Sequence, residues 1–309
     1  MDEVYPEHDL ECLTPAQVAF YNDNGYLLLE SRLPREVLDH AHAEVAAFRE
    51  EARTLRESSD RIDLEASHTP EEPRIRRIKL PHLNSPFFDE LMRSDLILAP
   101  ARDLLGPHLR LHTSKLNMKS ARYGAPVQWH QDFAFYPHTN DDLLAIGVML
   151  DDVDEENGPL LVFPGTHKGP LYDHHHHGVF AGAMDLEASG LALSDAVKIT
   201  GPAGSLSIHH ARIVHGSDLN RSQNDRGVLF YEMMATDAFP ILGSMAAAAS
   251  LEEYDQRILC GEPTKEPRLR PVPVRAPQPQ PSKHGSIYEI QMSTETKGFE
   301  TFEDADREQ

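Results

Sequence analysis

From His108 onward the chain consists of short apolar runs separated by glycine, proline and asparagine. This sequence pattern restricts the possible folds more strongly than any other feature of the chain. Short apolar runs bounded by turn residues are typical of strands. Many of them in succession predict a barrel or a jelly roll of two packed sheets. We therefore expect strands within 109–118, 127–135, 143–150, 160–163, 197–200, 206–209 and 228–234. Between two of these runs, Asn157-Gly158 favours positive backbone dihedrals and predicts a hairpin.

The part of the chain before this β region has a helical pattern. Thr14 and Pro15 predict a capped helix that ends at Gly25. Apolar residues at three- and four-residue spacing predict an amphipathic helix over 34–55. Residues 56–77 are polar and charged, and we expect a mobile loop or lid there.

The chain of 309 residues can bury one good core, and its length does not force a division into two domains. We expect a single domain over 1–309. Within it, 14–108 form a helical support region and 109–235 form the β core. Residues 262–309 form a proline-rich and acidic tail that we expect to be extended and irregular.

Acidic residues dominate the charge balance. Lys and Arg number 29 against 50 Asp and Glu, a formal net charge of -21, so the chain would repel nucleic acid and anionic membrane surfaces. The N-terminus lacks the basic start and apolar run of a secretory signal, and no stretch is apolar and long enough to span a membrane. Cys12 and Cys260 have no metal-type spacing. We expect a cytoplasmic protein, and its oligomeric state stays open.

A histidine and an aspartate two residues apart lie in the run over 127–135. If this run is a strand, alternation places Gln128, His130 and Asp132 on one face. An imidazole beside a carboxylate is two-thirds of the 2-His-1-carboxylate triad that binds iron(II) and leaves three coordination positions open. His42 and Glu44 have the same spacing, but they lie in the predicted helix, where residues two apart diverge and cannot chelate one ion.

Three histidines could supply the third ligand: His209, His210 and His215. His215 has the best context, because it follows an apolar pair and stands eleven residues before Arg226. An arginine at the start of a core strand is costly unless it binds an anion, and its planar fork matches a carboxylate. An ordinary salt bridge is the alternative role for Arg226.

These residues resemble the pattern of the phytanoyl-CoA dioxygenase family of iron(II)- and 2-oxoglutarate-dependent oxygenases. The family pattern is HxD, a distal His, Ser two residues later and Arg eleven residues later, and here it is met by His130, Asp132, His215, Ser217 and Arg226. The family's turn before a Pro-Gly-Ser/Thr-His sequence is matched over 157–167. The similarity extends from about 14 to 234, most of the chain.

The resemblance implies a mainly β, cupin-like double-stranded β-helix, or jelly roll, with flanking helices. In it His130, Asp132 and His215 bind Fe(II), while Arg226 and Ser217 hold the far carboxylate of 2-oxoglutarate. The implied activity is that of an oxidoreductase, a dioxygenase that hydroxylates a small organic molecule with dioxygen and releases succinate and carbon dioxide. The strand around 115–119 is similar to that of ectoine hydroxylase, so Asn117 is implied to contact 2-oxoglutarate.

The substrate is not implied by the resemblance. Thr113 and Tyr136 stand where ectoine hydroxylase has Gln and Trp, so ectoine is not the expected substrate. Besides these two, Gln128, His138 and Asn140 are candidate substrate contacts. For Gln128, a satisfied core amide is an equally good interpretation.

Several alternatives stay open. The four histidines from His174 to His177 suit a solvated loop better than a substrate lid or a second metal site. Arg268 and Arg270 in the tail could meet an anionic substrate at the barrel mouth, or belong to a solubilising linker. The rival function is a catalytically silent jelly-roll sensor that binds metal or 2-oxoglutarate. A metal isomerase, or a dioxygenase that needs no 2-oxoglutarate, is a further enzyme class.

Overall fold

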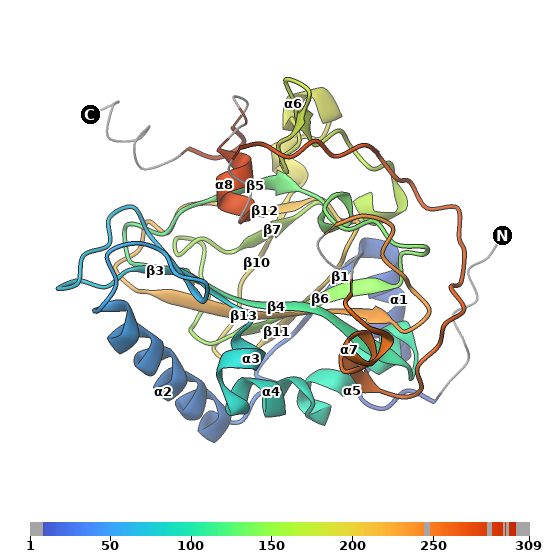
Figure 1. Ribbon diagram of the computed structural model, residues 1–309, viewed down its shortest axis with the longest axis horizontal. Coiled ribbons are helices and arrows are strands. Elements are labelled where there is room, and N and C mark those ends of the chain that lie inside the picture. The colour runs from blue at the N-terminus through green and yellow to red at the C-terminus, as the bar shows by residue number, and fades with distance from the viewer. Residues whose placement is uncertain (1–8, 244–247, 283–285, 293, 295–296, 301–309) are drawn as a thin grey trace.

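The apolar runs pair into two antiparallel sheets that face each other (Figure 1). We describe the computed structural model over residues 9–243, 248–282, 286–292, 294 and 297–300. The larger sheet has the strand order β1-β11-β6-β13-β4-β3-β2, with β14 also paired to β4. The smaller sheet has the order β10-β7-β12-β5, and β8 pairs with β9. This is the mainly β, double-sheet jelly roll that the strand pattern predicts.

The strands of the larger sheet are β1 (Tyr26–Leu29), β2 (Ile62–Leu64), β3 (Ile75–Lys79), β4 (Leu109–Lys119), β6 (Leu143–Met149), β11 (Leu206–His210), β13 (Arg226–Ala235) and β14 (Ile258–Cys260). Those of the smaller sheet are β5 (Val127–His130), β7 (Leu160–Val162), β10 (Val197–Ile199) and β12 (His215–Ser217). The outlying pair is β8 (His175–His176) and β9 (Val179–Phe180).

Helices cover the outer face of the larger sheet, where α2 to α5 lie side by side (Figure 1). The helices are α1 (Pro15–Asn24), α2 (Arg35–Ala52), α3 (Pro81–Asn84), α4 (Pro86–Met92), α5 (Asp95–Leu105), α6 (Leu186–Ser189), α7 (Leu251–Asp255) and α8 (Ile287–Gln291). Short 3-10 turns are η1 (Asp132–Ala134), η2 (Thr166–Lys168) and η3 (Leu193–Asp195). The first two helices confirm the sequence expectation, and Thr14 caps α1 as predicted by accepting a hydrogen bond from the backbone of Gln17.

Alternation along β13 divides its side chains between two cores. Leu229 and Tyr231 pack in the cluster beneath the helices, whereas Val228 and Phe230 pack in a second cluster that includes residues of both sheets. Successive side chains of a strand point to opposite faces. Arg226, two positions before Val228, therefore also turns toward the space between the sheets, where the candidate site lies.

Three sequence expectations are wrong in detail. Residues 56–77 are not only a loop, because β2 and most of β3 form there and extend the larger sheet. Gly158 does adopt a positive φ of 74°, but the turn joins β6 to β7 in the other sheet, so it is a crossing and not a hairpin. Asp132 is not on a strand, because the chain leaves the sheet after His130 and Phe133 N donates to Ala211 O at 2.8 Å.

The proline-rich stretch over 267–281 contains no helix or strand, as expected from its composition. Its two arginines fix it to the β core: Arg268 pairs with Asp142 and Asp237, and Arg270 also reaches Asp142 at 3.4 Å. The acidic end of the tail over 301–309 lies outside the described residues. No helix among the described residues is long and apolar enough to cross a membrane.

Candidate metal centre and co-substrate pocket

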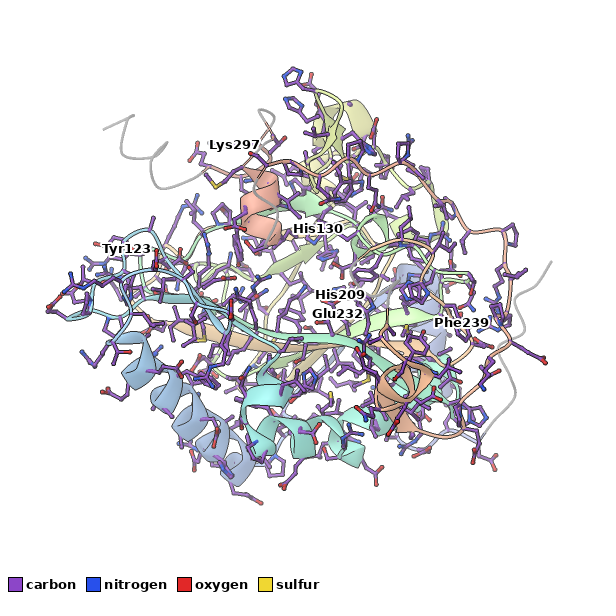
Figure 2. All side chains as sticks on the ribbon, viewed as in Figure 1. Tyr123, His130, His209, Glu232, Phe239 and Lys297 are labelled. Atoms are coloured by element: carbon purple, nitrogen blue, oxygen red, sulfur yellow. The ribbon has the colours of Figure 1, made fainter. Side chains whose placement is uncertain are left out.

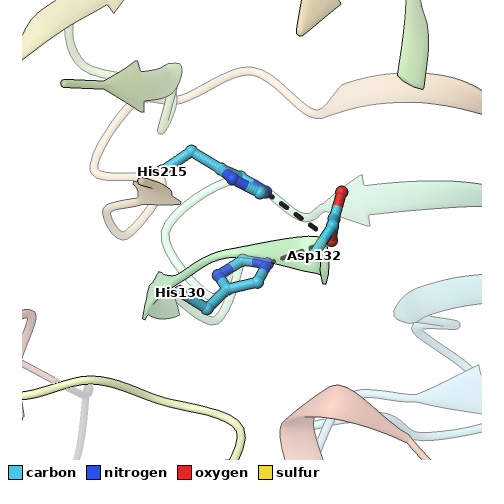
Figure 3. Close-up of side chains that lie close together, drawn as sticks. All are labelled: His130, Asp132 and His215. Carbon is cyan, nitrogen blue, oxygen red and sulfur yellow. Dashed lines mark ion pairs between the residues drawn. The ribbon is translucent and has the colours of Figure 1, made fainter. Parts of the chain in front are cut away.

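Two imidazoles and one carboxylate meet between the sheets (Figure 3). His130 ends β5, Asp132 opens the following 3-10 turn, and His215 begins β12 directly opposite His130 in the strand register. One ligand atom from each side chain lies within 4.8 Å of the others, and all three residues are buried. Asp132 Oδ1 is 3.5 Å from His130 Nε2 and 3.9 Å from His215 Nε2. The expected triad is therefore brought together by residues from three separate elements.

Backbone carbonyls fix the orientation of both imidazoles. His130 Nδ1 lies 2.8 Å from the carbonyl oxygen of Gln128, and His215 Nδ1 lies 3.0 Å from that of Ile213. A carbonyl only accepts, so each Nδ1 carries the proton and each Nε2 presents its lone pair toward Asp132. Histidine ligands of metals usually donate their other ring nitrogen in this way.

The protonation states also suit a metal. Burial opposes the charge on Asp132, but neighbouring His215 and Lys115 outweigh it and hold the pKa of Asp132 well below its usual range. Burial and the neighbouring His130 hold the pKa of His215 well below its usual value. To bind a metal, a histidine must be neutral and an aspartate must be ionised. An oxygen and nitrogen donor set of two His and one Asp fits iron(II) with open positions.

A second group of side chains from β4 and β13 forms a pocket beside the triad. It is lined by residues of both sheets, among them Asn117, Lys119, His215, Ser217 and Arg226. Arg226 on β13 is the register partner of Lys119 on β4, and both are buried. Burial lowers the pKa of Arg226 to about 10, and burial together with Arg226 lowers that of Lys119 well below its usual value.

Two like charges directly opposite each other on neighbouring strands destabilise a sheet unless an anion lies between them. Arg226 Nε is buried and has no hydrogen-bond partner among the described residues. Ser217 adds a hydroxyl donor, and Asn117 can donate only through its side-chain NH₂ group. The donors that line the pocket therefore fit a dicarboxylate whose other end reaches the triad.

Asp132 lines a second, wider cavity of about 750 Å³. Lys115 lines both this cavity and the pocket of Arg226, and its ammonium lies 2.6 Å from a carboxylate oxygen of Glu232. Burial and the carboxylates of Asp132 and Glu232 raise the pKa of Tyr136 well above its usual value, so this phenol stays a neutral donor. Figure 2 shows His130, His209 and Glu232 in the space between the two sheets.

The predicted substrate residues divide into two groups. Thr113 and Tyr136 line the wider cavity. Gln128 instead bonds to the C-terminal segment: its Oε1 accepts from Gly298 N at 2.7 Å, as a satisfied core amide does. His138 Nδ1 lies 2.6 Å from Tyr136 O, and Asn140 donates to Arg268 O at 3.1 Å. Gln128, His138 and Asn140 line neither of the two cavities.

The four consecutive histidines do not converge on one point. His174 is buried behind the metal strand and accepts a hydrogen bond from Gln131 N at 2.9 Å. His175 pairs with Asp173 at 2.8 Å and lies in the short strand β8. Among the described residues, the group that could hold a metal is the triad alone.

The sequence interpretation missed several residues of the site. Lys115, Lys119 and Glu232 are charged residues within the predicted strands, and they alternate in phase with Asn117 and Arg226. That period of two is a signal that could have found them. His112, His209, Ile287 and Tyr288 also line one or both of the two cavities.

Comparison with known families gives one match over most of the chain. Residues 21–228 match the family model described as phytanoyl-CoA dioxygenase (PhyH). A protein of Stutzerimonas stutzeri named as a probable alpha-ketoglutarate-dependent hypophosphite dioxygenase is 36% identical, over 90% of this chain and 97% of its own. The L-proline trans-4-hydroxylase of Streptomyces griseoviridis is 36% identical over 50% of this chain and 68% of its own.

A similar fold occurs in solved structures. EctD from S. alaskensis with bound Fe superposes with a TM-score of 0.63 at 23% identity, over 85% of this chain and 88% of that one. The carbocyclase SnoK from nogalamycin biosynthesis superposes with a TM-score of 0.61 at 21% identity, over 82% and 94% of the two chains. At these identities the likeness concerns the fold.

Proposed function

Because the chain belongs to the phytanoyl-CoA dioxygenase family and is an iron(II)- and 2-oxoglutarate-dependent dioxygenase, we propose which of its residues carry that activity. His130, Asp132 and His215 hold the iron(II). Arg226, with Ser217 and Asn117, holds 2-oxoglutarate. Bound iron(II) supplies the redox chemistry by which dioxygen converts 2-oxoglutarate to succinate and carbon dioxide and hydroxylates the substrate.

The like-charge pair Arg226 and Lys119 is the single observation that carries the co-substrate assignment. Both basic side chains are buried and are partners in the strand register. Each donates to a backbone carbonyl, Arg226 to Gly158 and Lys119 to Asp218, but Arg226 Nε lacks a protein acceptor in the described chain. A distal carboxylate placed between them relieves their repulsion and accepts the guanidinium fork. The pocket also contains His130 and His215, so the keto acid end of the same molecule lies near the triad.

We propose further that the substrate is a small anion bound in the wider cavity. The Lys115 ammonium has three N–H donors and lies 2.6 Å from Glu232 as an ion pair, so it can also donate to an incoming anion. Tyr136 and Thr113 line the same cavity and add hydroxyl groups next to Asp132. The hypophosphite dioxygenase relative is named for such an anion, and hypophosphite is therefore the first substrate to test.

Residues 1–309 are proposed to act as one oxygenase domain. The wall of the wider cavity contains residues from Asp60 to Ile290, so the N-terminal region, the β core and the tail contribute to the same site. The alternative of a catalytically silent sensor is not favoured, because the relatives are named as dioxygenases and hydroxylases.

Succinate formation with iron(II), 2-oxoglutarate and dioxygen tests the substrate proposal. Hypophosphite is followed by phosphorus NMR, since insertion of one oxygen atom into a P–H bond yields phosphite while the other atom enters succinate. L-Proline, a zwitterion with one carboxylate, is compared with its amide, which lacks that carboxylate. Faster coupled turnover of hypophosphite and of the compound with the carboxylate supports the proposal, and equal or faster turnover of the amide overturns it.

A further inference from the structure

Helix α8 lies beyond residues 21–228, which match the family model, yet it borders both cavities. Tyr288 on this helix lines the pocket of Arg226, Lys119 and Ser217. We propose that the Tyr288 hydroxyl is a further ligand of the far carboxylate of 2-oxoglutarate, so that the C-terminal segment completes the co-substrate pocket. This inference rests on the proposed function of that pocket.

The surroundings of Tyr288 support a role as a hydrogen-bond donor. Its side chain is buried with 7% exposure, and its ring lies 4.6 Å from the guanidinium carbon of Arg76. None of the described residues is a hydrogen-bond partner of its hydroxyl. Burial and the nearby carboxyl of Glu65 raise the pKa of Tyr288, which keeps the phenol protonated. A phenol that lines the pocket and has no protein acceptor among the described residues can donate its hydroxyl proton to a ligand bound there.

The carboxylate has room for this bond. An ionised carboxylate offers about four lone-pair sites. Arg226 and Lys119 approach from the larger sheet, while Ser217 belongs to the smaller one. Tyr288 adds a donor from α8, an element outside both sheets. The co-substrate is then held by strands of both sheets and by α8.

The segment that carries Tyr288 is fixed to the metal strand. Gln291 Oε1 accepts a hydrogen bond from Gln128 N at 2.9 Å, and Gln291 Nε2 donates to Gly182 O at 2.9 Å. Farther along, Phe299 N donates to Gln128 Oε1 at 3.0 Å, and the Phe299 ring lies 4.8 Å from that of Trp129. These contacts lie immediately before His130, so the position of α8 is set by the strand that carries the first metal ligand.

Binding of 2-oxoglutarate to the iron(II)-loaded protein under anaerobic conditions, measured by calorimetry, tests the inference without turnover. Tyr288→Phe removes the hydroxyl and keeps the ring, and it should raise the Kd about tenfold. Tyr254→Phe is the matched control: Tyr254 is also buried beside a guanidinium, with Arg110 at 3.9 Å, but it lines neither cavity. The control should keep the wild-type Kd.

Trp129 is the only tryptophan in the chain, so its fluorescence reports whether the C-terminal segment is docked. Phe299→Ala should change the Trp129 emission and raise the Kd together. A Tyr288→Phe protein with wild-type emission, wild-type thermal unfolding and a Kd within twofold of wild type overturns the inference. Arg226→Ala distinguishes failure of the Tyr288 proposal from failure of the proposed 2-oxoglutarate pocket. An unchanged Kd in Arg226→Ala overturns the assignment of the pocket itself.

Discussion

His209 Nε2 lies 3.5 Å from Asp132 Oδ2, on the side of the carboxylate opposite to His130, whose Nε2 lies 3.5 Å from Oδ1. His209 belongs to β11 of the larger sheet and His130 to β5 of the smaller one. Asp132 therefore lies between the sheets, with Oδ1 near the imidazoles of His130 and His215 and Oδ2 near His209. His209 limits the rotation of the carboxylate and leaves Oδ1 for the metal.

The first prediction concerns this contact. His209→Ala should lower kcat about 10- to 100-fold, as loss of a residue that orients a metal ligand usually does, while the Kd of 2-oxoglutarate changes little. His209→Gln keeps a donor on the same strand and should recover part of the rate. Oxygen consumption under saturating 2-oxoglutarate gives kcat. An alanine variant as fast as the wild type would show that His209 does not position Asp132.

Arg226 should determine the affinity for 2-oxoglutarate. Arg226→Ala removes the fork that holds the far carboxylate and should raise the KM for 2-oxoglutarate about 100-fold, within the range of paired hydrogen bonds to a charged group. Arg226→Lys keeps the positive charge but lacks the planar fork, so its KM for 2-oxoglutarate should lie between those of the wild type and Arg226→Ala. Succinate formation over a range of 2-oxoglutarate concentrations gives these values. Activity of Arg226→Ala without any added 2-oxoglutarate would favour an oxygenase of another class.

Lys115 should select the substrate by charge. Lys115→Met removes the ammonium beside Glu232 and should raise the KM for an anionic substrate about tenfold or more. Lys198 forms a similar ion pair with Glu155 at 2.9 Å, but it lies on the surface, so Lys198→Met is the matched control. Kinetics of both variants with hypophosphite, or with L-proline if that is the compound turned over, decide the point. Equal KM values for the two variants would exclude a role of Lys115 in recognition.

Stability should depend on pH through Glu65. Burial raises the pKa of Glu65 to about 7, against the opposing effects of Arg76 and the Ala125 backbone. The folded state holds a proton that the unfolded chain releases above pH 4.5, so the contribution of Glu65 to stability falls as the pH rises from about 4.5 to about 7. Glu65→Gln should leave stability nearly unchanged at about pH 4 and raise it by up to about 3 kcal/mol at about pH 8. Urea unfolding at both values measures the difference, and an equal effect at both would contradict the assignment.

The sequence predicts the two sheets and the three side chains of the triad because both depend on local patterns. Short apolar runs mark the strands, and the fixed sequence distances from His130 to Asp132 and from His215 to Arg226 are short, although His215 and Arg226 lie on strands of different sheets. Even so, Asp132 is held by a 3-10 turn and not by a strand. The pair stays together because His130 is the last residue of its strand and the turn directs Asp132 back toward it.

The substrate residues were harder to predict because their partners are distant in sequence. Gln128 shares a face with His130 in a regular strand, but its amide is bound by Phe299, 171 residues away. Asn140 is bound by the backbone of Arg268 in the tail. No local pattern encodes such contacts. Lys115 and Lys119 could have been predicted from the sequence, because they alternate with Asn117 along a single strand.

The central claim is that His130, Asp132 and His215 bind the iron(II). Anaerobic titration of the protein with iron(II), read as bound metal per chain, tests it most directly. The wild type should bind one equivalent, and replacing any of the three with Ala should abolish that binding. His42→Ala, from the other His-x-acid sequence, is the control and should bind as the wild type does, because His42 pairs with Asp151 on the surface. A full equivalent of iron(II) bound tightly by a triad variant would contradict the account.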